Sequence, residues 1–270
     1  MKRLLLLLGP VATLVLISCS YGEVQPYRPP AYYRPPDIGA DAVALGGHLY
    51  LRDCAFCHGS RGTGTEFGPN VIEGANGPAL YNFVLRTGRM PVNAPVEQMM
   101  RNTPAYTEDE IRAIVTYMTR EFRPAGPDIP HVDPARGDLT VGQQLYQEHC
   151  ASCHATTGIG GAMLTKRGRE FGGTAGIHIP GLEQSGALDI AEAIRTGPGN
   201  MPVFGPSVIN DEELDAVVAY SLYLKRPTDA GGAPIGRVGP VVEGAVGWIL
   251  GLGSLALFIR WMGTKAGERP

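Results

Sequence analysis

The chain has 270 residues, enough for one large domain or two small ones with additional segments. Hydrophobic residues make up 44% and charged residues 18%, which excludes a disordered chain and a polytopic membrane protein. The formal net charge of −3 is too small to favour a strongly charged partner, so no nucleic acid is expected to bind. The 37 glycines and 23 prolines predict long loops.

The amino-terminal residues predict export. A short basic region, Met1 to Arg3, precedes an apolar stretch over residues 4–17. The sequence Leu-Ile-Ser-Cys, from Leu16 to Cys19, closes this segment. This ending is similar to a bacterial lipobox, so residues 1–18 are interpreted as a signal peptide of lipoprotein type, with Cys19 acylated after cleavage. An ordinary signal peptide and an uncleaved anchor are the alternatives, and all three export the remaining chain.

Five prolines and four tyrosines fall within residues 20–37. This composition predicts an extended, polyproline-like tether over residues 19–37. The tether is interpreted as a spacer, and its tyrosines offer the alternative of lying along a partner's surface.

Two pentapeptides of the form Cys-x-x-Cys-His begin at Cys54 and at Cys150. This is the attachment signature of a c-type haem: two thiols add to the haem vinyl groups, and the histidine reaches one face of the iron. The pattern takes four of the five cysteines, so two covalently bound haem c groups are predicted. The covalent and proximal residues are Cys54, Cys57 and His58 for one haem, and Cys150, Cys153 and His154 for the other.

Other uses of the cysteines fit less well. Zinc ribbons separate their two Cys-x-x-Cys pairs by about 15 to 20 residues, far fewer than here. Exported cysteines often form disulfides, but that interpretation makes the two following histidines a coincidence. Thioredoxin-like chemistry requires a strand before the motif, whereas a helix is predicted.

An internal repeat surrounds both motifs. Gly46, Leu49 and Tyr50 precede Cys54 as Gly142, Leu145 and Tyr146 precede Cys150, and each set predicts a short helix entering the haem-binding turn. Each unit closes with a capping-box helix, beginning at Thr107 in one unit and at Asn210 in the other. Apolar residues at helical spacing follow each cap: Ile111, Ile114, Val115 and Met118, then Leu214, Val217, Val218 and Leu222.

The opening glycines and the matching Tyr117 and Tyr220 predict that the first and last helices of each unit cross closely. That crossing is the framework of small c-type cytochromes. Each unit is small for an unaided core, and a covalently held apolar ring would supply the missing interior.

The second axial ligand of each iron is predicted to be a methionine. Met90 and Met201 each follow a shared Arg-Thr-Gly sequence and precede a proline, which stiffens the loop. The repeated context favours these two over core methionines. Among the other methionines, Met99 and Met100 are predicted to lie in a helix before Asn102, and Met118 in the core. Met163 is too near His154 in sequence for its loop to reach the other face of the haem. His178 is the rival ligand for the second haem.

Further residues have possible supporting roles. Arg86 and Arg195 recur in both units, either as partners of haem propionates or as exposed arginines. Pro180 and one of Pro69 or Pro78 are candidates to offer a backbone carbonyl to the free N–H of each ligand histidine.

Residues 240–262 are nearly all apolar, and about 22 residues at ~1.5 Å rise give ~33 Å, enough to cross a bilayer. Trp261 suits the membrane boundary, and Lys265 and Arg269 predict a cytoplasmic carboxyl terminus. A buried core helix is the alternative. The chain is therefore predicted to span the cell membrane once, with its haem domains on the extracytoplasmic side.

The predicted fold is all-α, with two tandem small class I cytochrome c domains and one C-terminal transmembrane helix. The boundaries in chain order are signal peptide 1–18, tether 19–37, first cytochrome domain 38–123, linker 124–138, second cytochrome domain 139–227, linker 228–237, transmembrane helix 238–263 and cytoplasmic tail 264–270.

The mature chain resembles the dihaem cytochrome c subunit of actinobacterial-type cytochrome bcc complexes, the menaquinol:cytochrome c reductases. The matching features are both haem motifs, the loops that carry Met90 and Met201, and a Gly-Pro-x-x-Glu-Gly sequence from Gly239 to Gly244 that enters the terminal span. The amino terminus departs from that family, whose members have a longer basic leader and no such tether.

The resemblance implies a membrane-anchored electron carrier within a quinol:cytochrome c reductase. Its partners would be cytochrome b and Rieske iron–sulfur subunits, with electrons passing from the Rieske centre through both haems towards a haem–copper oxidase. The reductase activity would belong to the complex, because no residue set is placed for acid–base or nucleophilic catalysis. The alternatives are a free-standing membrane-tethered dihaem carrier and the electron-accepting subunit of a periplasmic dehydrogenase. A peroxide-reducing enzyme would need an open iron, against which the two methionine loops argue.

Overall fold

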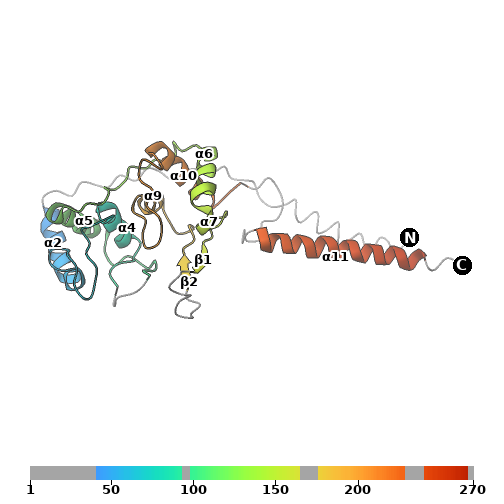
Figure 1. The fold of residues 1–270 in the computed structure, drawn as a ribbon, viewed down its shortest axis with the longest axis horizontal. Helices are drawn as coiled ribbons and strands as arrows, with labels where there is room; N and C mark the ends of the chain where they lie inside the picture. The colour runs from blue at the N-terminus through green and yellow to red at the C-terminus, as the bar shows by residue number, and fades with distance from the viewer. Residues whose placement is uncertain (1–40, 93–97, 165–175, 229–239, 267–270) are drawn as a thin grey trace.

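The computed structural model describes residues 41–92, 98–164, 176–228 and 240–266. The described part is mostly helical, as predicted, and two short strands form a hairpin in its second half (Figure 1). Strand β1 (Gly161–Leu164) pairs antiparallel with β2 (Gly176–Ile179), with Gly161 opposite Ile179. The predicted signal peptide, Cys19 and the tether lie outside the described residues.

The first helical unit contains α2 (Asp41–Asp53), α3 (Ala55–His58), α4 (Pro78–Arg86) and α5 (Glu108–Phe122). Its buried apolar side chains come from α2, α4 and α5 and form one cluster: Leu49, Tyr50, Tyr81, Leu85, Ile111, Ile114, Val115 and Met118. The periodic residues predicted for α5 all belong to this cluster, so the helical spacing correctly identified its buried face.

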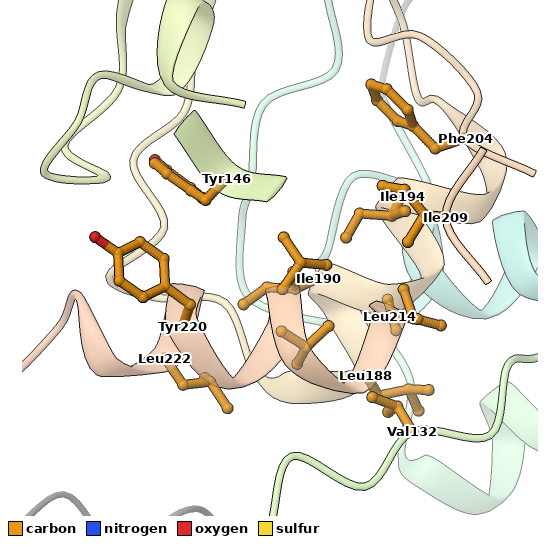
Figure 2. Packing of buried hydrophobic residues seen from close by; sticks show 13 residues of the cluster. Val132, Tyr146, Leu188, Ile190, Ile194, Phe204, Ile209, Leu214, Tyr220 and Leu222 are labelled. Atoms are coloured by element: carbon orange, nitrogen blue, oxygen red, sulfur yellow. The ribbon is translucent and has the colours of Figure 1, made fainter. Parts of the chain in front are cut away.

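The second unit repeats the arrangement with α6 (Leu139–His149), α7 (Ala151–His154), α9 (Ala187–Thr196) and α10 (Asp211–Tyr223). Figure 2 shows its core, in which Tyr146 from α6 and Tyr220 from α10 lie side by side while Ile190 and Leu214 join α9 to α10. All four apolar residues predicted to lie on one face of α10 are buried there.

Both capping boxes are present. The Thr107 hydroxyl accepts from the Glu110 backbone N–H, and the Glu110 carboxylate accepts from the Thr107 N–H. Asn210 and Glu213 make the same reciprocal pair at the start of α10. These side chains satisfy backbone donors that the first turn of a helix leaves without partners, and so fix where each closing helix begins.

The close crossing of opening and closing helices is confirmed. A Cβ on Gly46 would lie 1.9 Å from the carbonyl oxygen of Ala113, and a Cβ on Gly142 would lie 2.1 Å from that of Ala216. Any residue larger than glycine at either position would clash with the backbone of the crossing helix. The observed spacing of α2 from α5, and of α6 from α10, therefore requires glycine. Because haem motifs follow α2 and α6 directly, the crossings set where those motifs lie on each core.

The segment between the units, residues 124–138, packs on both of them. The Pro127 carbonyl accepts from Ala79 in α4, and the Asp215 carboxylate in α10 accepts from the Asp133 N–H. Ile129 contacts both core clusters. The two units also meet directly through α4 and α9, which are neighbours where the units join (Figure 1).

The terminal helix α11 (Pro240–Ala266) stands apart from both units in Figure 1. Its stretch Gly244–Thr264 has a mean hydropathy of 1.6 and is not covered by other described residues. By length and composition this helix could cross a membrane, as predicted.

The helix predicted around Met99 and Met100 is wrong. Residues 98–104 form no regular structure. The Asn102 N–H donates to the Thr87 carbonyl, and Gly88 approaches the Asn102 backbone so closely that a Cβ there would lie 2.2 Å from its oxygen. Contacts with the Met90 loop therefore override the helix-forming side chains of this short segment.

Candidate functional site

Each Cys-x-x-Cys-His motif is a helical turn that continues the opening helix. The Cys54 N–H donates to Tyr50 O at 2.8 Å, and the His58 N–H donates to Cys54 O at 2.9 Å. The Cys150 motif repeats these bonds, with 2.9 Å from Cys150 N to Tyr146 O and from His154 N to Cys150 O. The turn places both cysteines of a pair and the histidine next to the core that the opening helix helps to build.

A backbone carbonyl holds each motif histidine. His58 Nδ1 lies 2.8 Å from Pro69 O, and His154 Nδ1 lies 3.1 Å from Pro180 O. A carbonyl oxygen can only accept, so Nδ1 carries the proton and Nε2 keeps the lone pair that a metal requires. The structure selects Pro69 rather than Pro78, which begins α4, and it agrees with the expectation for Pro180.

Two buried tyrosines support the same turns. Tyr50 and Tyr146 are fully buried, and their hydroxyls donate at 2.8 Å to the carbonyls of Gly59 and Ala155, the residues that follow the histidines. The sequence repeat marked both tyrosines, but their role was not predicted because the hydrogen bonds bridge nine residues around a turn. They tie the end of each motif to its opening helix.

The residue after each histidine has an unusual backbone conformation. Gly59 has φ 77° and ψ 153°, and Ala155 has φ 62° and ψ 159°. This region suits glycine and strains a residue with a Cβ. The turn therefore persists at Ala155 against a local cost, which its hydrogen bond from Tyr146 helps to offset.

The first thiol of each motif is a poor thiolate. Burial raises the pKa of Cys54 to about 12 and that of Cys150 to about 11. Thiol–disulfide oxidoreductases lower this pKa instead, so the electrostatics disfavour such chemistry. Burial also lowers the pKa of His154, although the hydrogen bond to Pro180 acts in the opposite direction. The lowered pKa keeps the imidazole neutral and therefore able to bind a metal.

The structure brings each predicted methionine to the core that holds its motif. Met90 and Cys54 pack against the first cluster, while Met201 and Cys150 pack against the second. Both methionines are half-buried and follow α4 or α9 within a few residues. His178, the rival ligand, is exposed on β2, and its backbone pairs with Gln98.

Arg86 and Arg195 are not exposed arginines. Arg195 is buried, donates to the carbonyls of Phe204 and Ile209, and pairs with Asp211 at 2.8 Å. It therefore holds the loop that carries Met201. Arg86 instead lies 3.5 Å from Asp189 of the second unit and 3.6 Å from Glu108.

The residues fit a covalently attached haem. In each unit two unpaired, half-buried cysteines lie one helical turn apart, and a histidine keeps Nε2 free. The two cysteine pairs belong to different cores, so they do not form one zinc site. The motif arrangement suits two separate attachments.

Comparisons with known proteins agree with this geometry. A model of the cytochrome c oxidase, cbb3-type, subunit III family matches residues 41–118 and 137–220, more than half of the chain. The chain is 32% identical over 244 residues to the cytochrome bc1 complex cytochrome c subunit of Corynebacterium diphtheriae, covering 83% of this chain and 81% of that protein. It is 30% identical over 268 residues to the subunit of the same name from Mycobacterium tuberculosis, covering 96% of this chain and 91% of that protein.

A chain of the Kuenenia stuttgartiensis reducing HAO-like protein complex aligns with a TM-score of 0.35 and 19% identity, covering 71% of this chain and 99% of that one. This structural likeness is too low to contribute to the assignment. The sequence relatives and the two matched domains are sufficient, and the terminal helix could cross a membrane. The chain belongs to the family of cytochrome bc1 complex cytochrome c subunits and is an electron carrier whose cytochrome c domains bind haem c covalently.

Proposed function

We propose that the chain carries two haem c groups and conducts electrons inside a quinol:cytochrome c reductase. One haem would be held by Cys54 and Cys57 and the other by Cys150 and Cys153. The observation that carries this proposal is the repetition of one geometry: in both units a backbone carbonyl fixes the motif histidine with Nε2 free.

The axial ligands would be His58 with Met90 and His154 with Met201. Bound haem iron supplies a one-electron couple, and a methionine ligand raises its potential relative to a second histidine. The chain's own residues hold and orient this couple: the prolyl carbonyls fix the imidazoles, and Arg195 fixes the loop of Met201. Both iron faces would be occupied, so the chain transfers electrons without binding a small substrate.

The neighbours in the complex would be cytochrome b and a Rieske iron–sulfur protein, with a haem–copper oxidase receiving the electrons. Support comes from the relatives, which are named as subunits of a bc1 complex. The reductase activity would belong to the complex, to which this chain contributes an electron path.

The cytochrome domains would lie outside the cell membrane, at residues 38–123 and 139–227, with α11 spanning it and the carboxyl terminus in the cytoplasm. Lys265 and Arg269, after the apolar stretch, favour this orientation. Residues 1–18 would direct export, and Cys19 would be acylated. Mass spectrometry of the mature amino terminus tests the last point, because a lipid-modified Cys19 carries a diacyl or triacyl mass.

Co-purification tests the placement in a complex. Affinity-tagged chain extracted in mild detergent is expected to bring down a b-type cytochrome and an iron–sulfur protein in constant proportion. Isolation of the fully haem-loaded chain alone, under conditions that keep other respiratory complexes intact, would contradict the proposal and favour a free-standing carrier.

A further inference from the structure

A polar contact is buried between the two cytochrome domains. Asn82 in α4 donates from Nδ2 to Glu192 Oε1 in α9 at 2.6 Å. The exposed fractions are 5% for Asn82 and 0% for Glu192, so both residues are buried. Among the described residues Glu192 Oε2 has no hydrogen-bond partner. A buried polar pair of this kind stabilises only the arrangement in which the two helices meet in one register.

The repeat shows that this contact is specific to the interface. When the shared Arg-Thr-Gly sequences at the ends of α4 and α9 are aligned, Glu192 takes the position of Phe83. Phe83 is a buried apolar side chain, as a core position requires. A carboxyl group at the equivalent place in the second unit weakens that unit alone, because a buried polar group without a partner is costly. Its partner, Asn82, comes from the other domain.

A second layer of charges surrounds the buried pair. Asp189, one turn before Glu192 and 6% exposed, lies 2.8 Å from Arg101 and 3.5 Å from Arg86 of the first domain. Its carboxylate also accepts from the Gly186 N–H at the start of α9. Two arginines of one domain thus meet one carboxylate of the other, while that carboxylate caps the helix carrying Glu192.

A third contact lies at the hairpin. The Gln98 side-chain amide donates to His178 O at 2.5 Å and accepts from His178 N at 3.1 Å. This reciprocal pair joins the segment after Met90 to the edge of β2. The three contacts lie on α4, on residues 98–101, on α9 and on β2. Of these, α4 and α9 directly precede the methionine loops, and residues 98–101 follow the loop of Met90.

We propose that this interface, centred on Asn82 and Glu192, locks the two cytochrome domains in one relative arrangement, and that its residues are positioning residues for electron transfer between the two haem sites. The proposal rests on the proposed function, since it assumes a haem in each domain. Electron transfer depends on the separation and orientation of the two sites. A fixed interface therefore sets the rate without any of its residues touching a haem.

The test uses the full, haem-loaded chain in detergent and measures two quantities. Spin labels on T116C in α5 and Q144C in α6, in a C19S background, report the distance between the domains. Flash reduction reports the rate of electron transfer between the haems. Thr116 and Gln144 are exposed and make none of the three interface contacts, so they are suitable positions for the labels.

Two variants weaken the interface from the first domain. N82A leaves the buried carboxyl group without its donor and is expected to lower the docked-to-undocked ratio about tenfold. R101Q removes one charge from a half-exposed side chain and is expected to act in the same direction with a smaller effect. Both variants should broaden the distance distribution and slow the transfer, while the haem spectra and the haem content stay unchanged.

Two controls make the result specific. R52Q removes a surface ion pair with Asp53 inside the first domain and should behave as the original chain does. E192Q keeps a side-chain oxygen that accepts from Asn82, so it should retain a single narrow distance. Unchanged distances and transfer rates in both N82A and R101Q would overturn the proposal, as would equal broadening in R52Q. A haem content of one per chain would instead refute the proposed function, while the label distance still tests the locked interface.

Discussion

At the scale of single residues, one backbone carbonyl decides how each motif histidine behaves. The carbonyl oxygens of Pro69 and Pro180 accept from the Nδ1–H of His58 and His154. These hydrogen bonds fix the orientation of each imidazole ring and leave Nε2 available as a ligand. The sequence motif alone predicted the histidines as ligands. It did not distinguish Pro69 from Pro78, because that choice depends on the path of the loop between them.

The methionine ligands carry a spectroscopic prediction. M201H is expected to lower the potential of one haem by on the order of 0.1–0.3 V, within the ~0.8 V range over which axial ligands set haem potentials. It should also remove the sulfur-to-iron band from the red end of the spectrum. Redox titration with optical detection measures both. M100H is the matched control, since Met100 is exposed, and an unchanged spectrum in M201H would contradict the ligand assignment.

The strained turn after His154 carries a stability prediction. A155G should raise the free energy of unfolding by about 1 kcal/mol, because glycine adopts the conformation at Ala155 without strain. G59A is the reverse change at the equivalent place and should lower it by about 1–3 kcal/mol. Its Cβ would also lie 3.2 Å from Gly64 O. Denaturant unfolding of the haem-loaded protein measures both, and destabilisation by A155G would contradict this account of the turn.

At the scale of elements, the crossing of two helices places each haem motif. Capping sequences and apolar spacing predicted α5 and α10, and the glycine and tyrosine pairs predicted that α2 and α6 would cross them closely. These features are local or repeated, so the sequence contains them. The hairpin β1–β2 was not predicted, and residues 98–104 were wrongly assigned to a helix, because contacts between distant segments determine both.

The crossing predicts a large effect for one added methyl group. G142A should lower the free energy of unfolding by about 2 kcal/mol, since the new Cβ meets Ala216 O and the helices must separate. G205A is a suitable control, because nothing lies within 4 Å of the position of its Cβ. Thermal unfolding measures the difference, and equal stability of the two variants would show that α6 and α10 are not tightly packed at this point.

At the scale of the whole molecule, the two domains behave as one body only if their interface holds. The repeat predicted two similar domains and a linker. It did not predict that Glu192 of one domain would meet Asn82 of the other, because these residues are far apart in sequence and neither recurs at the equivalent place of the other unit. Within the described residues, the charged groups around Glu192 are Arg86 from α4, Asp189 from α9 and Glu108 from α5.

This interface predicts a pH dependence. Burial raises the pKa of Glu192 from 4.5 to about 8, while Asn82 and Arg86 oppose the shift. Between these pH values the folded protein keeps a proton on Glu192 that the unfolded chain has lost, so the contribution of Glu192 to stability is greatest below pH 4.5, falls as the pH rises to about 8, and then stays level. The loss is a few kcal/mol at most.

Unfolding of E192Q measured over the same pH range isolates this contribution. The glutamine does not titrate, so the fall in stability between pH 4.5 and about 8 should be smaller than in the original chain. Identical pH profiles for the two proteins would show that Glu192 does not hold a proton at the interface.

Electron transfer through this chain requires that it hold two covalently attached haems. The most direct measurement is a pyridine haemochrome assay on protein of known concentration, produced in a host that attaches haem c. We expect two c-type haems per chain, falling to one when both cysteines of either motif are replaced. Fewer than two haems in the unaltered chain would contradict this expectation.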